Sequence, residues 1–290
     1  MLTLAVAHRE ETFERIEEPL RDRGIEVEPI SITSQTTPIG EESPDPGGFD
    51  AGFVFPGRIM EGGVLDALLD VPWVNDREAV LRSRNKAGTL TRLAEADLPV
   101  PKTVLVSNPV EEDAVREAFE RFEPPVVVKP NSTTRGNGVL QVSEVDSLLG
   151  ATDYLDLLHE FPATGDRSYL IQEAIETTRD YRVMLLEGEF VGAVERSLPE
   201  DERDRGRWKR NVHRGATAEG VTPPPPVTRL AERAAEAMDI PLLGVDILVS
   251  PEKTVVTETN ARPTIDREEK YVGDFYDRLT GLIERTATGR

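Results

Sequence analysis

Apolar and polar positions follow a regular order along the first 76 residues. Apolar runs at residues 2–7, 25–30, 49–55 and 71–74 have the composition of β-strands, and helical segments at 10–23 and 63–69 lie among them. Strands that alternate with helices predict a parallel sheet with covered faces. The first part of the chain is therefore expected to form a small α/β domain.

The rest of the chain contains more strands than helices. Helices are predicted at 77–96, 111–122, 144–160, 226–238 and 268–285, and strands at 103–106, 125–130, 139–142, 169–175, 180–186 and 189–195. Asn75 or Asp76 is a candidate N-cap for the first of these helices. No internal repeat is apparent.

Residues 242–263 carry a prominent chemical signal, because carboxylates interrupt two apolar strands joined by a short turn. Asp246 lies inside the first strand, and Glu258 and Asn260 lie two residues apart on the second. Residues two apart on a strand point to one face, and a hairpin can bring Asp246 beside them. Three oxygen donors in one place suit Mg²⁺. Taken alone, the three residues favour a half-exposed hairpin with a polar face over a metal site.

A second signal is Lys129, at the end of the apolar run PVVVKP. A lysine cannot stay charged and buried without an anionic partner, although it could also emerge at the solvent end of the strand. The segment NSTTRGNG follows directly. Small and glycine residues between strands let backbone N–H groups turn toward a phosphate, but most such turns are plain hairpins. Neither a Walker A motif nor a GxGxxG motif after the first strand is present.

The amino-acid composition bears on the source of the protein, its cellular compartment and its partners. Fifty-four acidic residues against 34 basic ones give a net charge of -20, which suits a folded protein in high intracellular salt and predicts a halophilic, archaeal source. This charge argues against nonspecific binding to nucleic acid. Cysteine is absent and the three histidines are scattered, so a reducing cytoplasm is expected and thiolate or histidine metal sites are not. No apolar run is long enough to span a membrane, and the first residues, MLTLAVAHREE, are expected to form a strand instead of a signal peptide.

In this order and spacing the motifs resemble the ATP-grasp superfamily, and most of all its RimK-like branch of carboxylate–amine ligases. The resemblance covers about residues 72–263. The matching motifs are RNK at 84–86, VVVKP ending at 130, RGNGV at 135–139, Gln172-Glu173, Asp180 and Arg182, Arg196, NVHRG at 211–215, Asp246, and Glu258 with Asn260. The resemblance implies an ATP-grasp fold, with an N-terminal α/β pre-ATP-grasp domain at 1–76, a central α+β subdomain with a glycine lid at 77–171, and a C-terminal α+β subdomain with a Mg²⁺ site at 172–290.

The resemblance also implies roles for individual residues. Those expected to bind ATP are Lys86, Lys129, Arg135, Gly136, Gly138, Gln172, Glu173, Ala174, Ile175, Asp180 and Lys209. Among these, Lys86, Lys129 and Lys209 are expected on phosphates, 173–175 on adenine and Asp180 on ribose. Asp246, Glu258 and Asn260 are expected to hold two Mg²⁺ ions, with Mn²⁺ as an alternative metal. Arg196 and Asn211 are expected to face the transferred phosphate and the acyl group.

These residue types suit one reaction class. Attack of a carboxylate on the γ-phosphate of ATP gives an acyl phosphate, which an amine then displaces, and neutralised phosphate charge is the main requirement. The glycine loop is expected to act as a lid that excludes water. Two positions depart from the family pattern: Asn131-Ser132 replace the usual glycine start of the lid, and Thr259 stands where an apolar residue is usual.

The predicted function is therefore an ATP-dependent ligase that adds an amino acid, with glutamate favoured, to an unidentified carboxylate acceptor. Two alternatives stay open at this point: a kinase that passes phosphate to a hydroxyl, and a nucleotide-binding regulator without turnover. Homo-oligomerisation is left open, and no membrane or nucleic-acid partner is expected.

Overall fold

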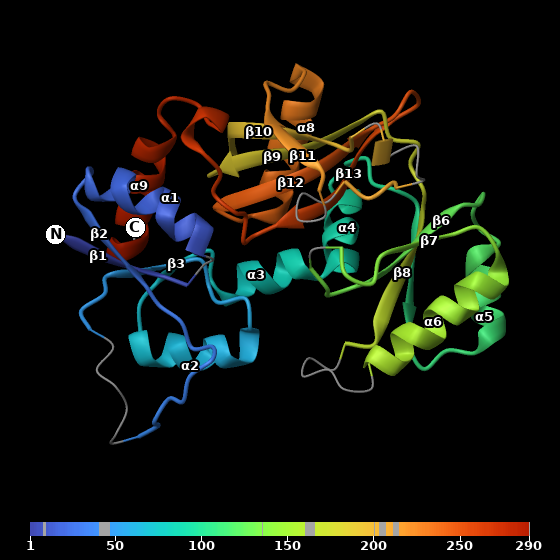
Figure 1. Ribbon diagram of the computed structural model, residues 1–290, viewed down its shortest axis with the longest axis horizontal. Helices are drawn as coiled ribbons and strands as arrows, with labels where there is room; N and C mark the ends of the chain where they lie inside the picture. Colours follow the sequence, from blue (N-terminus) through green and yellow to red (C-terminus); the bar gives the residue numbers. More distant parts are fainter. Residues whose placement is uncertain are drawn as a thin grey trace.

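Three β-sheets with flanking helices make up the protein (Figure 1). The computed structural model describes residues 1–7, 10–40, 47–134, 136–159, 166–199, 201–202, 207–210 and 215–289. Within these ranges no helix is both long and apolar enough to cross a membrane. The α/β pattern predicted for the start of the chain and the α+β pattern predicted for the rest are confirmed.

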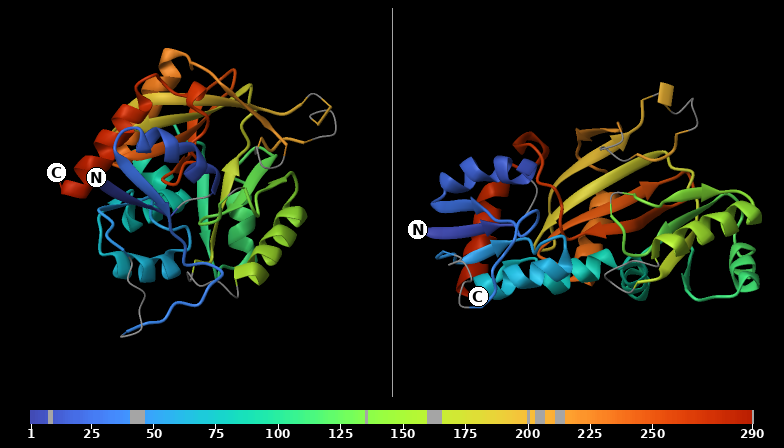
Figure 2. Two further views of the ribbon diagram at one scale, coloured as in Figure 1. Left: turned by 60° about the vertical axis from the view of Figure 1, so that its left-hand side comes forward. Right: turned by 60° about the horizontal axis from the view of Figure 1, so that its bottom comes forward.

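The N-terminal sheet is parallel, with strand order β2-β1-β3-β4. Its strands are β1 (Leu2–Val6), β2 (Ile25–Pro29), β3 (Ala51–Phe53) and β4 (Trp73–Val74). Helices α1 (Glu10–Arg21) and α2 (Ile59–Leu69) connect them, and α9 (Phe275–Thr288), from the end of the chain, packs on β3 and β4. Both termini therefore lie on this part of the molecule (Figures 1 and 2).

The central sheet is antiparallel, with order β5-β8-β6-β7. Its strands are β5 (Thr103–Ser107), β6 (Val126–Pro130), β7 (Leu140–Val142) and β8 (Ser168–Glu173). Helices α5 (Glu112–Phe119) and α6 (Val145–His159) lie side by side on the outer face of the sheet (Figure 2). Apolar residues of these elements form a separate core around Val128, Leu148 and Ile171.

The C-terminal sheet is also antiparallel, with order β11-β10-β9-β12-β13. Its strands are β9 (Arg179–Leu186), β10 (Glu189–Ser197), β11 (Thr217–Gly220), β12 (Leu242–Val249) and β13 (Thr254–Asn260). Helix α8 (Pro225–Met238) buries Leu230, Ala234 and Met238 against one face of the sheet. The opposite face is the one that carries the polar side chains of the hairpin β12–β13.

Two helix predictions are wrong in detail. Residues 77–96 form two helices, α3 (Arg77–Arg84) and α4 (Lys86–Glu95), because Asn85 leaves helical geometry and its side chain caps α4 by accepting from the Gly88 N–H at 3.0 Å. Asp76 is the N-cap of α3. The last helix begins at Phe275 and not at 268, since the backbone N–H of Val272 bonds to Val191 of β10; residues Glu268–Lys270 form only a short 3₁₀ turn, η2.

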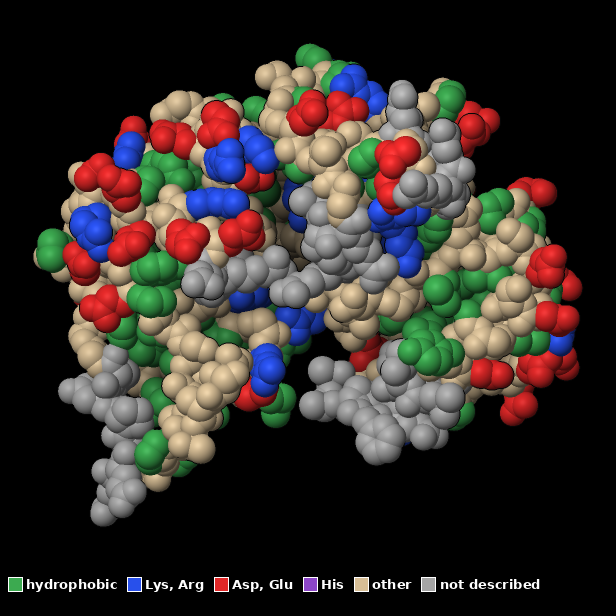
Figure 3. Space-filling view, viewed as in Figure 1, with side chains coloured by type: hydrophobic (Ala, Val, Ile, Leu, Met, Phe, Trp, Pro, Cys, Tyr) green, Lys and Arg blue, Asp and Glu red, His purple; other side chains and the backbone are tan. Residues whose placement is uncertain are grey.

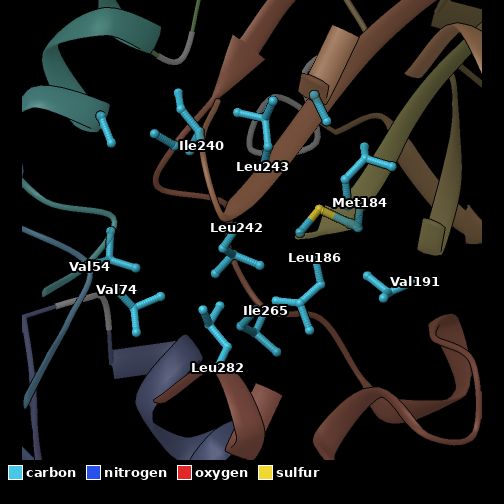
Figure 4. Close-up of a cluster of buried hydrophobic side chains, with 14 of the residues drawn as sticks. Val54, Val74, Met184, Leu186, Val191, Ile240, Leu242, Leu243, Ile265 and Leu282 are labelled. Carbon is cyan, nitrogen blue, oxygen red and sulfur yellow. The ribbon is translucent and has the colours of Figure 1, made fainter. Parts of the chain in front are cut away.

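The N-terminal and C-terminal sheets share one apolar core (Figure 4). Val54, directly after β3, and Val74 of β4 pack in the same cluster as Leu186 and Leu242 of the C-terminal sheet. Asn75 adds a polar link, since its buried side-chain amide donates to the carbonyl oxygens of Leu242 and Ala261. The boundaries predicted near 76 and 171 stay a prediction, but this packing joins the two outer parts more closely than either is joined to the central one.

Candidate active site

Three side chains form a row across the face of the C-terminal sheet that α8 leaves uncovered. Arg182 on β9, Asp246 on β12 and Glu258 on β13 lie directly opposite one another in the strand register. The register shifts just beyond the Asp246–Glu258 pair, so that Thr257 is an extra residue on β13. Bulges of this kind re-aim side chains and recur beside functional sites. Asn260, two residues after Glu258, points to the same face.

Asp246 is the centre of a buried ion-pair network. Its carboxylate accepts from Arg182 Nε at 2.7 Å and Nη2 at 2.8 Å, and from Arg196 Nη1 at 3.1 Å. Burial opposes ionisation, but the two guanidinium groups outweigh it and lower the pKa of Asp246 to about 2. Arg196 also donates to Asp180, which is 5% exposed. The network fixes Arg196 between two carboxylates at the base of the site.

Mg²⁺ fits the oxygen donors at this place. Asp246 is shared with two arginines, whereas Glu258 is partly exposed and its nearest cation, Lys86 Nζ, lies at 3.9 Å. The side-chain Nδ2 of Asn260 is buried and has no hydrogen-bond partner among the described residues. The O and N positions of a side-chain amide can be exchanged, so the unpaired position of Asn260 can hold its oxygen. A buried amide atom without a partner calls for an explanation, and a bound ligand at this place supplies one. No group of three or more His, Cys, Asp or Glu side chains suited to a metal occurs in the described part of the chain, so Asn260 would complete the set.

Two buried lysines suit a polyphosphate. Lys86 and Lys129 are 5% and 6% exposed. Lys86 Nζ donates to the carbonyl oxygen of Thr133. The side chain of Lys129, in contrast, has no ion pair or hydrogen bond among the described residues. Burial lowers the pKa of Lys129 to about 8, although Glu258 raises it and Lys86 lowers it further. In the described part of the chain, few opposite charges and no hydrogen bonds offset the loss of hydration of this buried ammonium group. An anion that binds there would explain why the charge is tolerated.

The segment after Lys129 is tied to the start of α4. The Asn131 side chain accepts from the Ala87 N–H at 2.8 Å, and the Asn131 carbonyl oxygen accepts from the Lys86 N–H at 3.2 Å. Asn131 thus supplies a helix cap in place of the glycine usual in the resembling family. Further on, Gly138 has φ +71°, and a Cβ there would lie 2.8 Å from Pro130 Cγ, so only glycine fits.

Thr259, the other unusual position, faces away from Glu258. Its hydroxyl donates to Ser83 Oγ at 3.2 Å, and the same Ser83 oxygen accepts from the Ala261 N–H at 3.0 Å. The two bonds hold the end of α3 against β13. This contact positions Arg84 and Lys86, which follow Ser83, beside the polar face of the sheet.

A cavity of about 1160 Å³ opens between the N-terminal and C-terminal sheets, and the segment after Lys129 in the central part of the chain also lines it. Among the described residues, nine basic and four acidic side chains line it, although the whole chain carries a net charge of -20. Figure 3 shows basic side chains around the hollow at the middle of the molecule and acidic side chains toward its outer edge. The predicted site residues that line the cavity are Lys86, Gly136, Arg196, Asp246, Glu258 and Asn260.

Other predicted site residues are not among those that line the cavity. These are Lys129, Gly138, Gln172, Glu173, Ala174, Ile175, Asp180 and Lys209. Gln172 donates to Thr103 Oγ1, Glu173 pairs with Lys253 at 2.6 Å, and Lys209 lies 5.6 Å from the Trp208 ring. Since Asp180 is engaged by Arg196, a ribose contact stays a prediction that requires it to change partners. Arg135 and Asn211 lie outside the described residues.

The cavity also contains residues that had no role assigned from the sequence, although Arg84 and Arg182 belong to the motifs quoted above. Arg84, Arg182 and Arg262 line it, together with Thr133 and Thr134 from the segment after Lys129. Arg182 alternates with Asp180 along β9, and that i, i+2 spacing was a usable signal. Arg84 and Arg262 come together only through the fold, because they lie far apart in the sequence.

Comparison with known proteins gives the family. Residues 83–278 match the RimK-like ATP-grasp domain. The chain belongs to the RimK-like ATP-grasp family. It is 30% identical over 212 residues to a probable alpha-L-glutamate ligase of Stenotrophomonas maltophilia, which covers 72% of this chain and 67% of that protein. It is also 30% identical over 219 residues to the ribosomal protein bS6–L-glutamate ligase of Shigella boydii, with coverage of 74% and 68%.

Solved structures of the same fold support the architecture. D-alanine–D-alanine ligase from Bacillus anthracis, in complex with ATP, superimposes with a TM-score of 0.70 at 15% identity, over 100% of this chain and 98% of that one. A RimK-domain ATP-grasp protein from Sphaerobacter thermophilus gives 0.69 at 21% identity, over 98% of both chains. The predicted ATP-grasp fold is thus confirmed. As a RimK-like family member, the chain is an ATP-dependent carboxylate–amine ligase, and ligases of this family use ATP and Mg²⁺.

Proposed function

We propose that the chain joins an amino acid, with glutamate favoured, to a carboxylate acceptor through an acyl phosphate. The arrangement that carries the proposal is the row of Asp246 and Glu258, with Asn260 beside it, next to two buried lysines, of which Lys86 lines the same cavity and lies 3.9 Å from Glu258. Two relatives at 30% identity bear the name of glutamate ligases, which supports glutamate as the amine.

ATP would lie with its phosphates between Lys86 and Lys129. These ammonium groups, together with the backbone near Gly136 and Gly138, would neutralise the triphosphate and fix the γ-phosphate for in-line attack. Asp246, Glu258 and Asn260 would hold two Mg²⁺ ions, whose chemical contribution is to offset negative charge on the phosphates. Residues 173–175 would contact the adenine, Asp180 the ribose and Lys209 the γ-phosphate.

The first step forms a bond between an oxygen of the acceptor carboxylate and the γ-phosphorus, and breaks the bond to the β–γ bridging oxygen, which leaves with ADP. Arg196 is held by Asp180 and Asp246 at the base of the cavity, where it would stabilise the transferred phosphate and later the acyl oxygen. Asn211 is proposed to assist it. In the second step the neutral amine attacks the acyl carbon, phosphate leaves, and the amine proton passes to solvent or to the departing phosphate.

The test is ADP release from Mg-ATP in molar KCl, across a panel of amino acids, with and without an acceptor fraction from cell extract. Release that needs both glutamate and the acceptor fraction is the expected result, and mass spectrometry of that fraction then identifies the product. Release that needs an acceptor but no amine would instead indicate a kinase. Glu258→Gln is the matched inactive control, because it keeps the shape of the side chain and loses the charge.

A further inference from the structure

The wall of the cavity farthest from the central sheet is built by the N-terminal sheet. Its parallel strands end there: Ala7 and Ile30, directly after β1 and β2, line the cavity, and so does Gly57, four residues after the end of β3. The crevice at the carboxyl ends of parallel strands is the usual ligand site of an open α/β sheet. The nucleotide-binding lysines and the oxygen donors lie on other elements, so this wall is left for a different part of the substrates.

Two guanidinium groups from separate elements converge on Gly57 in this wall. Arg84, the last residue of α3, donates from Nη2 to the Gly57 carbonyl oxygen at 2.8 Å. Arg262, just after β13, donates to the carbonyl oxygens of Ala7, Val54 and Phe55, and its Nε would lie 3.4 Å from a Cβ at Gly57. Both arginines line the cavity. We call this pair the Gly57 arginines.

The carboxylates on this wall are already paired. Glu11 binds Arg15 at 3.0 Å, and Asp266 binds Lys270 at 2.7 Å and Arg15 at 3.6 Å. Arg84, in contrast, forms no ion pair among the described residues, and its one hydrogen-bond acceptor there is a neutral carbonyl oxygen. Burial lowers the pKa of Arg84, as expected of a half-buried cation without a counter-charge. Most of its donors remain available to a ligand, in a planar arrangement that matches a carboxylate.

We propose that the Gly57 arginines bind a non-reacting carboxylate of a ligase substrate, at the end of the cavity opposite the central sheet. The proposal rests on the ligase function above, and it adds that one of the two joined molecules carries a second carboxylate held by Arg84. That carboxylate belongs either to the amino acid that supplies the amine or to an acceptor that ends in acidic residues. In both cases the arginine fork would orient the molecule toward Glu258 and Lys86.

Binding is tested on the full chain loaded with Mg²⁺ and the non-hydrolysable analogue AMP-PNP. L-glutamate represents the amine substrate and N-acetyl-Glu-Glu represents an acidic acceptor; isothermal titration gives each affinity. Arg84→Met is expected to weaken one of them at least tenfold, and which one weakens tells the source of the carboxylate. The affinity of Arg84→Lys for that carboxylate should lie between those of wild type and Arg84→Met, because an ammonium group keeps the charge but lacks the paired donors of a guanidinium. Arg77→Gln is the control: it removes an exposed arginine from the same helix, outside the cavity.

A structural role for Arg84 predicts a different result. If Arg84 only held α3 in place, Arg84→Met would lower the melting temperature and weaken AMP-PNP binding as well. Removal of an unpaired half-buried charge should instead leave the melting temperature the same or higher, with AMP-PNP affinity unchanged. The inference is overturned if both carboxylates bind Arg84→Met as tightly as wild type, if AMP-PNP affinity falls in parallel, or if neither carboxylate binds wild type. Wild-type carboxylate binding without amine-dependent ADP release would count against the ligase function alone.

Discussion

Lys129 allows the electrostatics of the site to be tested in the absence of substrate. Its pKa falls from an ordinary 10.5 to about 8, mainly through burial. Since one pH unit corresponds to about 1.4 kcal/mol, the folded protein carries its ammonium form at a cost of about 3 kcal/mol. We therefore expect Lys129→Met, which keeps the length of the side chain, to raise the free energy of unfolding at pH 7 by up to about 3 kcal/mol.

The pH dependence gives this prediction its sign. Between pH 8 and 10.5 the unfolded chain binds a proton at Lys129 that the folded chain does not, so wild-type stability contributed by this residue rises with pH over that window. The advantage of Lys129→Met should be complete below pH 8 and vanish near pH 10.5. Urea unfolding followed by tryptophan fluorescence measures it, with the exposed Lys102→Met as control.

Nucleotide binding should change in the opposite direction. Without the ammonium group, AMP-PNP affinity is expected to fall about tenfold to a hundredfold, the size of one charge-assisted hydrogen bond. A Lys129→Met protein that is less stable than wild type at pH 7, or that binds AMP-PNP equally well, would show that Lys129 has a packing role and not a phosphate-binding role.

Three further results are expected. Glu258→Gln should abolish turnover with an unchanged melting temperature, and retained ADP release would contradict its assignment to the metal. Asp246→Asn leaves Arg182, which is 32% exposed, and the more buried Arg196 without this carboxylate, so urea unfolding should show a loss of up to about 3 kcal/mol; a loss below about 1 kcal/mol would mean that the site is well hydrated. The melting temperature should increase with KCl into the molar range, because salt screens repulsion at a net charge of -20; a decrease would argue against a halophilic protein.

The elements that the sequence predicted best were those with strong periodicity. The hairpin around Asp246 and Glu258 was predictable because apolar strand formers flank both carboxylates, and the two strands have little choice of partner. The break at Asn85 was not, because the helical pattern continues through 77–96 and one side-chain cap decides the matter. The late start of α9 depends on Val272 pairing with β10, a tertiary contact that no local pattern contains.

Among the site residues, too, positions set by a local pattern were predictable and contacts between distant segments were not. Glu258 and Asn260 were predictable from their spacing on one strand, but the engagement of Asp246 by Arg182 and Arg196 depends on the order of three strands in the sheet. Nor could the sequence indicate that Arg84 and Arg262 meet at Gly57, since 178 residues separate them. Contacts between distant segments are set by how whole elements pack, and a local pattern carries little of that information.

The division of the apolar cores bears on how the site could close. One core joins the N-terminal and C-terminal sheets, and a second lies wholly within the central sheet and its two helices. The links between the two are polar, such as Lys86 with Thr133 and Glu173 with Lys253. A shift of the central sheet would break a few hydrogen bonds and ion pairs without exposing either core, and exposed ion pairs contribute little. The segment after Lys129 belongs to the central part and lines the cavity, so a shift of the central sheet is the motion that would produce a water-excluding closure over ATP.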